Sequence, residues 1–238
     1  LNVRATYFAE TEAWIRHLVD EQGLSSIAIL YQDDGFGRVG LAGVTAALEK
    51  RGMTLAAEGT YTRNTVAVKK ALLTIRKADP DAVVMVGAYK PVAEFIKLSR
   101  KLKFDPTFVN ISFVGSKALA EELGDAGEGV IVSQVVPFPW DTSVPVVADY
   151  QAALKAVDAG AEPGFVSLEG YLTGRLALRA LEDAGQALTR DSYLAAMRNL
   201  RDIDFGGVSM AFGPGDNQGM ETVFLTRITA DGSFEPVE

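Results

Sequence analysis

The chain has 238 residues, 48% of them hydrophobic, so it can bury one large core or two smaller ones and is not a disordered tail. Its net charge of −8, from 23 basic and 31 acidic residues without a basic run, argues against nucleic-acid or anionic-membrane partners and favours small solutes. Cysteine is absent and His17 is the single histidine, which excludes thiol chemistry and leaves a Cys/His zinc site or a His-based triad without residues.

The chain begins with an extended segment, followed by a predicted helix over residues 10–22 that Gly23 ends. His17 lies among charged residues of this helix and is predicted to be solvated. No uncharged apolar run approaches the roughly 18 residues that a membrane span needs. We therefore expect no direct membrane insertion.

Four strand-and-helix units and a further strand come next, and the strand starts fall every 22 to 28 residues. This is the spacing of parallel strands joined by crossover helices. The strands are predicted at 27–31, 54–58, 82–86, 107–110 and 129–133, and the helices at 38–51, 65–78, 91–102 and 116–123. The pattern predicts an α/β fold in which helices cover both faces of a parallel sheet.

The loop after the first strand carries a G-x-G-x-x-G pattern, at Gly35, Gly37 and Gly40. Glu58, about twenty residues further on, sits where a dinucleotide fold would hold ribose. However, Asp33 and Asp34 place two carboxylates between the strand and the first glycine, where they would repel a pyrophosphate. We therefore expect the glycines to let the helix start close to the sheet, and we expect no bound cofactor.

The segment 135–140, V-V-P-F-P-W, breaks this rhythm, because two prolines hold the chain extended and indicate a crossing between domains. Helices are predicted after it at 144–159, 166–184 and 190–200, with Thr189 as the cap of the last, and strands at 207–212, 221–229 and 233–237. These helices have no parallel sheet of their own to cover. Part of the fold is therefore expected to be missing from this chain or supplied by another.

Several stretches together resemble a known family: L-N-V-R-A-T-Y-F-A-E-T-E-A-W, I-A-I-L-Y-Q-D-D-G-F-G, V-V-M-V-G-A-Y-K-P-V-A-E-F-I and S-L-E-G-Y-L-T-G-R-L-A-L-R-A-L. In this order they resemble the type I periplasmic binding proteins of ABC importers, specifically the branched-chain amino acid (Leu/Ile/Val) receptors. The resemblance implies two lobes of doubly wound parallel sheet joined by three crossings, with the front half of lobe 1 missing. It implies lobe 2 at 1–133, the returning part of lobe 1 at 134–218, and the third crossing with the C-terminal strands at 219–238.

The resemblance also implies which residues contact the ligand. Phe36 and Tyr89 match positions whose rings wall the pocket, and Glu169 and Tyr171 sit at the cleft-facing start of the long lobe 1 helix. Ser112 matches the position where amino-acid-binding members carry a glutamate for the substrate ammonium. No acid lies near Ser112 in the sequence, although Asp34 could substitute. We expect no catalytic residue and no metal ligand.

The resemblance implies a non-enzymatic receptor that is periplasmic, or extracellular and lipid-anchored, and that presents its ligand to the membrane permease subunits of an ABC importer. The expected ligand is a small amino acid-like solute, carboxylate or amide with an apolar or aromatic body, for which an α-ammonium is not required. One alternative is an NAD(P)-dependent or metal-dependent α/β enzyme that uses Asp33, Asp34 and Glu58. Another is the ligand-sensing domain of a regulator with the same fold.

Overall fold

The computed structural model describes residues 1–237 and divides the chain into two units. The sheet unit comprises Tyr7–Gln134 and the segment from Val223, and the helical unit comprises Leu1–Thr6 and Val135–Thr222. The lobe boundaries implied by the resemblance stay a prediction; they are 1–133, 134–218 and 219–238.

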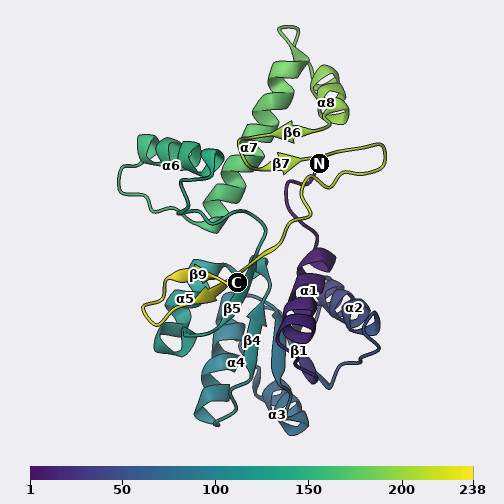
Figure 1. Cartoon of the computed structure of the whole chain (residues 1–238), viewed down its shortest axis with the longest axis vertical. Coiled ribbons are helices and arrows are strands. Elements are labelled where there is room, and N and C mark those ends of the chain that lie inside the picture. The colour runs from purple at the N-terminus through teal and green to yellow at the C-terminus, as the bar shows by residue number, and fades with distance from the viewer. Residues whose placement is uncertain (238) are drawn as a thin grey trace. The chain divides into compact units, whose positions relative to one another are not determined.

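The sheet unit contains seven strands in the order β2-β1-β3-β4-β5-β8-β9. Figure 1 labels β1, β4, β5 and β9 of this sheet. Their bounds are β1 Ile27–Gln32, β2 Ala57–Tyr61, β3 Ala82–Val86, β4 Thr107–Asn110, β5 Ile131–Gln134, β8 Phe224–Ile228 and β9 Phe234–Pro236. The first five pair in parallel, as predicted, while β8 and β9 are antiparallel additions. The central strand β3 is buried at every residue, which is typical of a strand covered on both faces.

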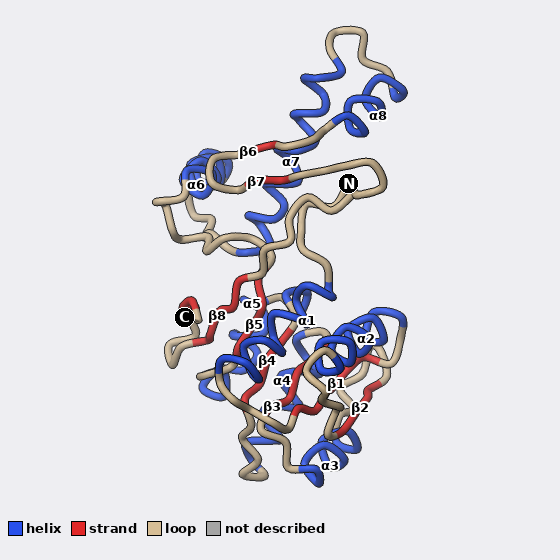
Figure 2. The backbone as a smooth tube through the Cα atoms, turned by 45° about the vertical axis from the view of Figure 1, so that its right-hand side comes forward, coloured by secondary structure: helices blue, strands red, loops and turns tan. Residues whose placement is uncertain are grey.

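Helices cover both faces of this sheet (Figure 2). One face carries α1 (Tyr7–Ile15), its π-helical continuation η1 (Arg16–Glu21) and α2 (Gly35–Glu49); Trp14, Leu18, Val44 and Leu48 are among the residues that pack there. The other face carries α3 (Lys69–Ala78), α4 (Tyr89–Lys101) and α5 (Ser116–Leu123); Leu72, Ile75, Phe95 and Leu119 are among its residues. Two short 3-10 turns, η2 (Ser112–Val114) and η3 (Gly124–Gly127), flank α5. The predicted α/β layering is confirmed.

The predicted solvation of His17 is wrong. The side chain is buried, and its Nδ1 lies 2.7 Å from Oε2 of Glu21. Position 17 falls three residues after the buried Trp14, so it shares the sheet-facing side of the helix. Glu21 supplies the polar partner that lets an imidazole occupy this place.

The helical unit contains three helices and one short hairpin. The helices are α6 (Pro145–Val157), α7 (Phe165–Ala184) and α8 (Arg190–Asn199), and the hairpin pairs β6 (Ile203–Asp204) with β7 (Ser209–Met210). The predicted cap of α8 is confirmed, because the Thr189 side chain accepts a hydrogen bond from the Ser192 amide in a capping box. Strand β6 was not predicted. Among residues 1–237, the hairpin β6-β7 is the sheet of this unit.

Apolar side chains of the helical unit are exposed, as expected for helices without a sheet to cover. They include Val157, which is 90% exposed, together with Val166, Leu178, Leu181 and Leu188. We expect the 238-residue chain to self-associate, because contiguous apolar surface is covered in stable soluble proteins. Light scattering after size exclusion tests this: Leu178→Glu with Leu181→Glu should shift the chain toward monomer. Leu73→Glu, in the sheet unit, is the control and should leave the oligomeric state unchanged. A wild-type chain that is monomeric at every concentration measured would contradict the expectation.

Candidate functional site

The parallel strands of the sheet unit end at one edge, and ligands of open parallel sheets bind beyond such an edge. The turns and helix starts that follow β1, β3 and β4 carry the predicted site residues Asp34, Phe36, Tyr89 and Ser112. The structure therefore brings these four to the same edge of one unit. Glu169 and Tyr171 lie on α7, in the helical unit.

Asp34 forms the turn between β1 and α2. Its Oδ1 accepts a hydrogen bond from the Gly37 amide at 3.1 Å, as the N-cap of α2, and its Oδ2 accepts one from Gln32 Nε2 at 2.5 Å. Partial burial acts to raise the pKa of the Asp34 carboxyl, but these hydrogen bonds outweigh it and the pKa lies below its ordinary value. The carboxylate thus holds the turn that presents Phe36.

A buried network connects this turn to the two neighbouring strands. The Tyr61 hydroxyl, at the end of β2, donates to Oε1 of Gln32 at 3.3 Å and accepts from the Ala88 amide at 3.1 Å. Burial raises the pKa of the Tyr61 hydroxyl, which keeps its proton available for donation. Ala88 immediately precedes Tyr89, a half-buried residue at the start of α4 that packs against the core. The ends of β1, β2 and β3 are therefore fixed to one another.

The G-x-G-x-x-G glycines are explained by the packing of α2 on the sheet. A Cβ at Gly37 would lie 1.9 Å from the Gln32 carbonyl oxygen, and one at Gly40 would lie 2.4 Å from Val86 Cγ2. A Cβ at Gly35, by contrast, would meet no atom within 4 Å. The motif lets helix and strand approach closely, as predicted from the sequence.

The three acids of the enzyme alternative have separate partners. Asp33 forms an ion pair with Arg38 at 2.5 Å, and Glu58 accepts a hydrogen bond from the Tyr31 hydroxyl at 3.4 Å, while Asp34 caps α2. Within residues 1–237 no group of three or more His, Cys, Asp or Glu side chains is arranged to hold a metal ion.

Glu10, on α1, is a buried carboxylate directly behind Ser112 and was not predicted. Its Oε2 accepts from the Ser112 amide at 2.9 Å and from Ser133 Oγ at 2.5 Å, and its Oε1 accepts from Ser112 Oγ at 2.9 Å. The side chain is 0% exposed. Its sequence position offered a signal, because it precedes the apolar Ala13 and Trp14 by three and four residues and so shares their buried side.

Aromatic rings form a row along this edge. The Phe36 ring centroid lies 5.5 Å from that of Tyr7 and 5.3 Å from that of Phe113. Phe113 follows Ser112 in the turn η2, and its side chain is 62% exposed. Neither Phe113 nor Tyr7 was among the site residues predicted from the sequence. We call these three residues the aromatic row.

The predicted residues of the helical unit have partners in that unit. Glu169 Oε1 lies 3.8 Å from Arg4 Nη1. The Tyr171 hydroxyl accepts a hydrogen bond from Arg175 Nη1 at 2.8 Å, and its ring packs 5.7 Å from that of Tyr150. The arrangement orients both side chains within the first turns of α7.

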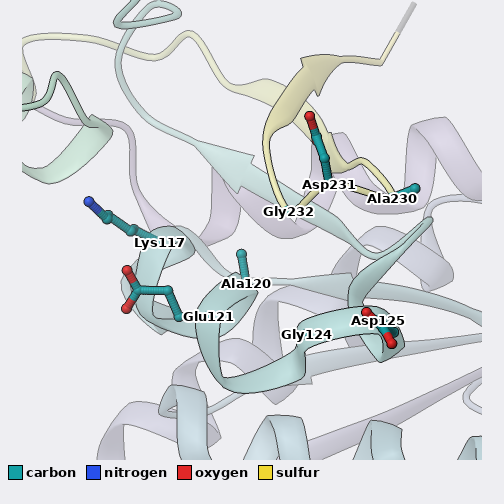
Figure 3. Close-up of a pocket in the computed structure, with 8 residues that line it drawn as sticks. All are labelled: Lys117, Ala120, Glu121, Gly124, Asp125, Ala230, Asp231 and Gly232. Atoms are coloured by element: carbon teal, nitrogen blue, oxygen red, sulfur yellow. The ribbon is translucent and has the colours of Figure 1, made fainter.

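Two surface hollows lie elsewhere on the sheet unit. One of about 340 Å³ lies between α5 with η3 and the β8-β9 turn; its lining includes Lys117, Glu121, Asp125 and Asp231 (Figure 3). Hydrogen bonds from the Thr229 and Ser233 hydroxyls lower the pKa of Asp231 to about 2. The Asp231 carboxylate therefore stabilises the β8-β9 turn in which it lies. The other, of about 510 Å³, is lined by Leu73, Arg76, Lys77, Asp79, Lys103 and Phe104. Neither contains a predicted site residue.

Comparison with known proteins matches this chain to binding proteins and ligand-binding receptors. A family model described as periplasmic binding protein matches residues 1–233. A possible leucine/isoleucine/valine-binding protein from Rhodopirellula baltica SH 1 is 34% identical, with a TM-score of 0.93 over 100% of this chain and 66% of that one. A substrate-binding periplasmic protein from Ralstonia solanacearum is 26% identical, with a TM-score of 0.89 over 99% and 67%. An extracellular ligand-binding receptor from Verminephrobacter eiseniae ef01-2 is 27% identical, with a TM-score of 0.87 over 98% and 66%. The chain thus spans about two thirds of these structures.

Proposed function

Because this chain belongs to the periplasmic binding protein family, we propose that the complete protein is the solute-binding receptor of an ABC importer. The predicted family and the type I periplasmic-binding-protein fold are confirmed by the match to residues 1–233 and by the structural likeness. The proposed solute is a small amino acid-like molecule, carboxylate or amide. The proposed transport step is closure of two lobes on that solute, followed by delivery to membrane permease subunits.

The observation that carries this proposal is the composition of the carboxyl edge of the sheet unit. Rings at Phe36 and Tyr89 lie at the same edge as the polar Ser112, and hydrogen bonds to Tyr61 and Glu10 fix the backbone at Ala88 and Ser112. Rigid pockets with mostly apolar walls and a few placed polar groups are typical of small-molecule sites. We assign Phe36 and Tyr89 to the wall, Ser112 to a polar contact and Asp34 to the turn, with Glu169 and Tyr171 as contacts from lobe 1.

The proposed ligand class follows from Ser112. The Ser112 hydroxyl donates its proton to Glu10, so it can only accept a hydrogen bond from a ligand. A serine hydroxyl in place of a ligand-facing carboxylate exchanges a charge-assisted hydrogen bond to ammonium for a weaker one, a loss of roughly 1–2 kcal/mol. Desolvating an ammonium adds to that loss. An α-ammonium is therefore not required in this proposal, and a carboxylate or amide with an apolar body is favoured.

The proposed receptor is non-enzymatic and acts in the periplasm, or at the cell exterior on a lipid anchor. The separate partners of Asp33, Asp34 and Glu58 support the first point, because a catalytic or metal-binding trio would converge on one place. None of the helices within residues 1–237 has the length and apolar character to cross a bilayer.

A thermal-shift and calorimetric screen of the complete receptor tests the proposal. Leucine, its keto acid and small aromatic carboxylates are the probes, and at least one should bind. Phe36→Ala should then weaken binding about tenfold or more, because it removes a ring from the apolar wall. Val39→Ala, on the same helix and 41% exposed, is the matched control and should leave affinity unchanged. An absence of binding by every probe would reject the ligand class, and equal losses in both variants would reject the role of Phe36.

A further inference from the structure

We propose that Phe113 contacts the solute and makes the receptor prefer one with a planar aromatic group. This inference rests on the proposed function and names the part of the site that recognises the solute body. It gives a role in solute binding to Phe113, the exposed end of the aromatic row. Neither the sequence pattern nor the family resemblance singled out this residue.

Phe113 is exposed on a backbone that is anchored on both sides. Ile111 and Val114 are buried, and Ser112 binds Glu10 through both its amide and its hydroxyl, at 2.9 Å each. The turn η2 is thereby fixed to a buried carboxylate on α1. A flexible loop could fold its phenylalanine onto the protein surface, whereas this turn holds the ring out at 62% exposure.

Phe113 is also the end of a row of three neighbouring rings. Its ring lies 5.3 Å from Phe36 at an interplanar angle of 60°, and Phe36 lies 5.5 Å from Tyr7 at 66°. Single exposed apolar residues are ordinary, but three neighbouring rings beyond the carboxyl ends of a parallel sheet form a surface suited to a ligand.

The geometry of the row favours an aromatic occupant over an aliphatic one. Aromatic pairs prefer tilted or edge-to-face contacts with centroids about 4.5–7 Å apart, and both pairs of the row have such geometry. A further ring placed on Phe113 continues the same arrangement and gains the quadrupole interaction as well as apolar burial. A branched aliphatic group gains the burial alone.

The test compares two matched pairs of probes on the complete receptor by calorimetry. The pairs are 3-phenylpropionate with 4-methylpentanoate, and L-phenylalanine with L-leucine, so that each pair differs in the ring. For Phe113→Ala we expect affinity for the aromatic member to fall about tenfold and affinity for the aliphatic member to change within about threefold. Phe113→Trp should retain aromatic binding. Leu73→Ala, exposed beside the larger of the two surface hollows, is the control and should change neither.

The outcomes separate this inference from the proposed function. A wild type that binds the aliphatic probes and not the aromatic ones keeps the receptor function and overturns the role of Phe113. Aromatic binding that survives Phe113→Ala, or that falls together with aliphatic binding, overturns it too. A wild type that binds no probe of either pair rejects both.

Discussion

Gly37→Ala is expected to destabilise the sheet unit by about 3 kcal/mol or more, because the new methyl group would lie 1.9 Å from a backbone carbonyl oxygen. That oxygen belongs to Gln32, in β1, so no side-chain rotation can relieve the clash. Helix α2 would have to move away from the strand, and the Asp34 cap, which depends on the Gly37 amide, would be lost with it. Urea denaturation followed by far-UV circular dichroism measures the change.

Gly35→Ala is the matched control two residues earlier in the same motif. Its methyl group would meet no atom within 4 Å, so stability should change by no more than about 0.5 kcal/mol. Equal losses in the two variants would show that the motif has a requirement beyond close packing. A stable Gly37→Ala protein would contradict the geometry of the turn.

Glu10→Ala should lower the free energy of unfolding by about 3 kcal/mol or more. The carboxylate accepts from the Ser112 amide, the Ser112 hydroxyl and the Ser133 hydroxyl, and all three hydrogen bonds would be lost. The Ser133 hydroxyl would keep the Asn110 carbonyl oxygen, at 3.2 Å, as its acceptor. Glu10→Gln keeps the shape and one acceptor oxygen, so about half of that loss is expected. Denaturant melts of the three proteins, with the unfolding free energy extrapolated to water, give the comparison.

The control for Glu10 is another acid of the same helix. Glu12 is more accessible and pairs with Lys50 and Arg51, both at 2.9 Å, in contacts that water screens. Glu12→Ala should therefore lower the free energy of unfolding by about 1 kcal/mol or less. If Glu10→Ala were as mild as Glu12→Ala, the buried hydrogen bonds of Glu10 would contribute little to stability.

The parallel core could be predicted closely from the sequence, because its strands are short apolar runs. The predicted bounds 82–86 and 107–110 match β3 and β4. The edge strand β2 begins three residues later than predicted, at Ala57. It pairs only with β1 and buries alternate residues, so its apolar pattern is weaker.

The site could be predicted only where chain position determines it. A residue shortly after a parallel strand reaches the carboxyl edge whatever surrounds it, and Phe36, Tyr89 and Ser112 all lie there. Their contact with a ligand was predicted from the family resemblance and stays a prediction. The contact between Glu10 and Ser112 joins residues 102 positions apart, and no local pattern reveals it. Phe113 follows Ser112 in the same turn, and no local pattern in the sequence indicated its exposure or its contact with Phe36.

The antiparallel pairing of β5 with β8 has a consequence for folding during synthesis. Strand β8 begins at Phe224, after the whole of the segment 135–222 has been made, yet it pairs along β5 from Ile131 to Gln134. Until the ribosome reaches it, β5 has an open edge able to pair with another chain. We expect the nascent sheet unit to acquire its parallel core early and to become resistant to proteases only after β8 and β9 have joined.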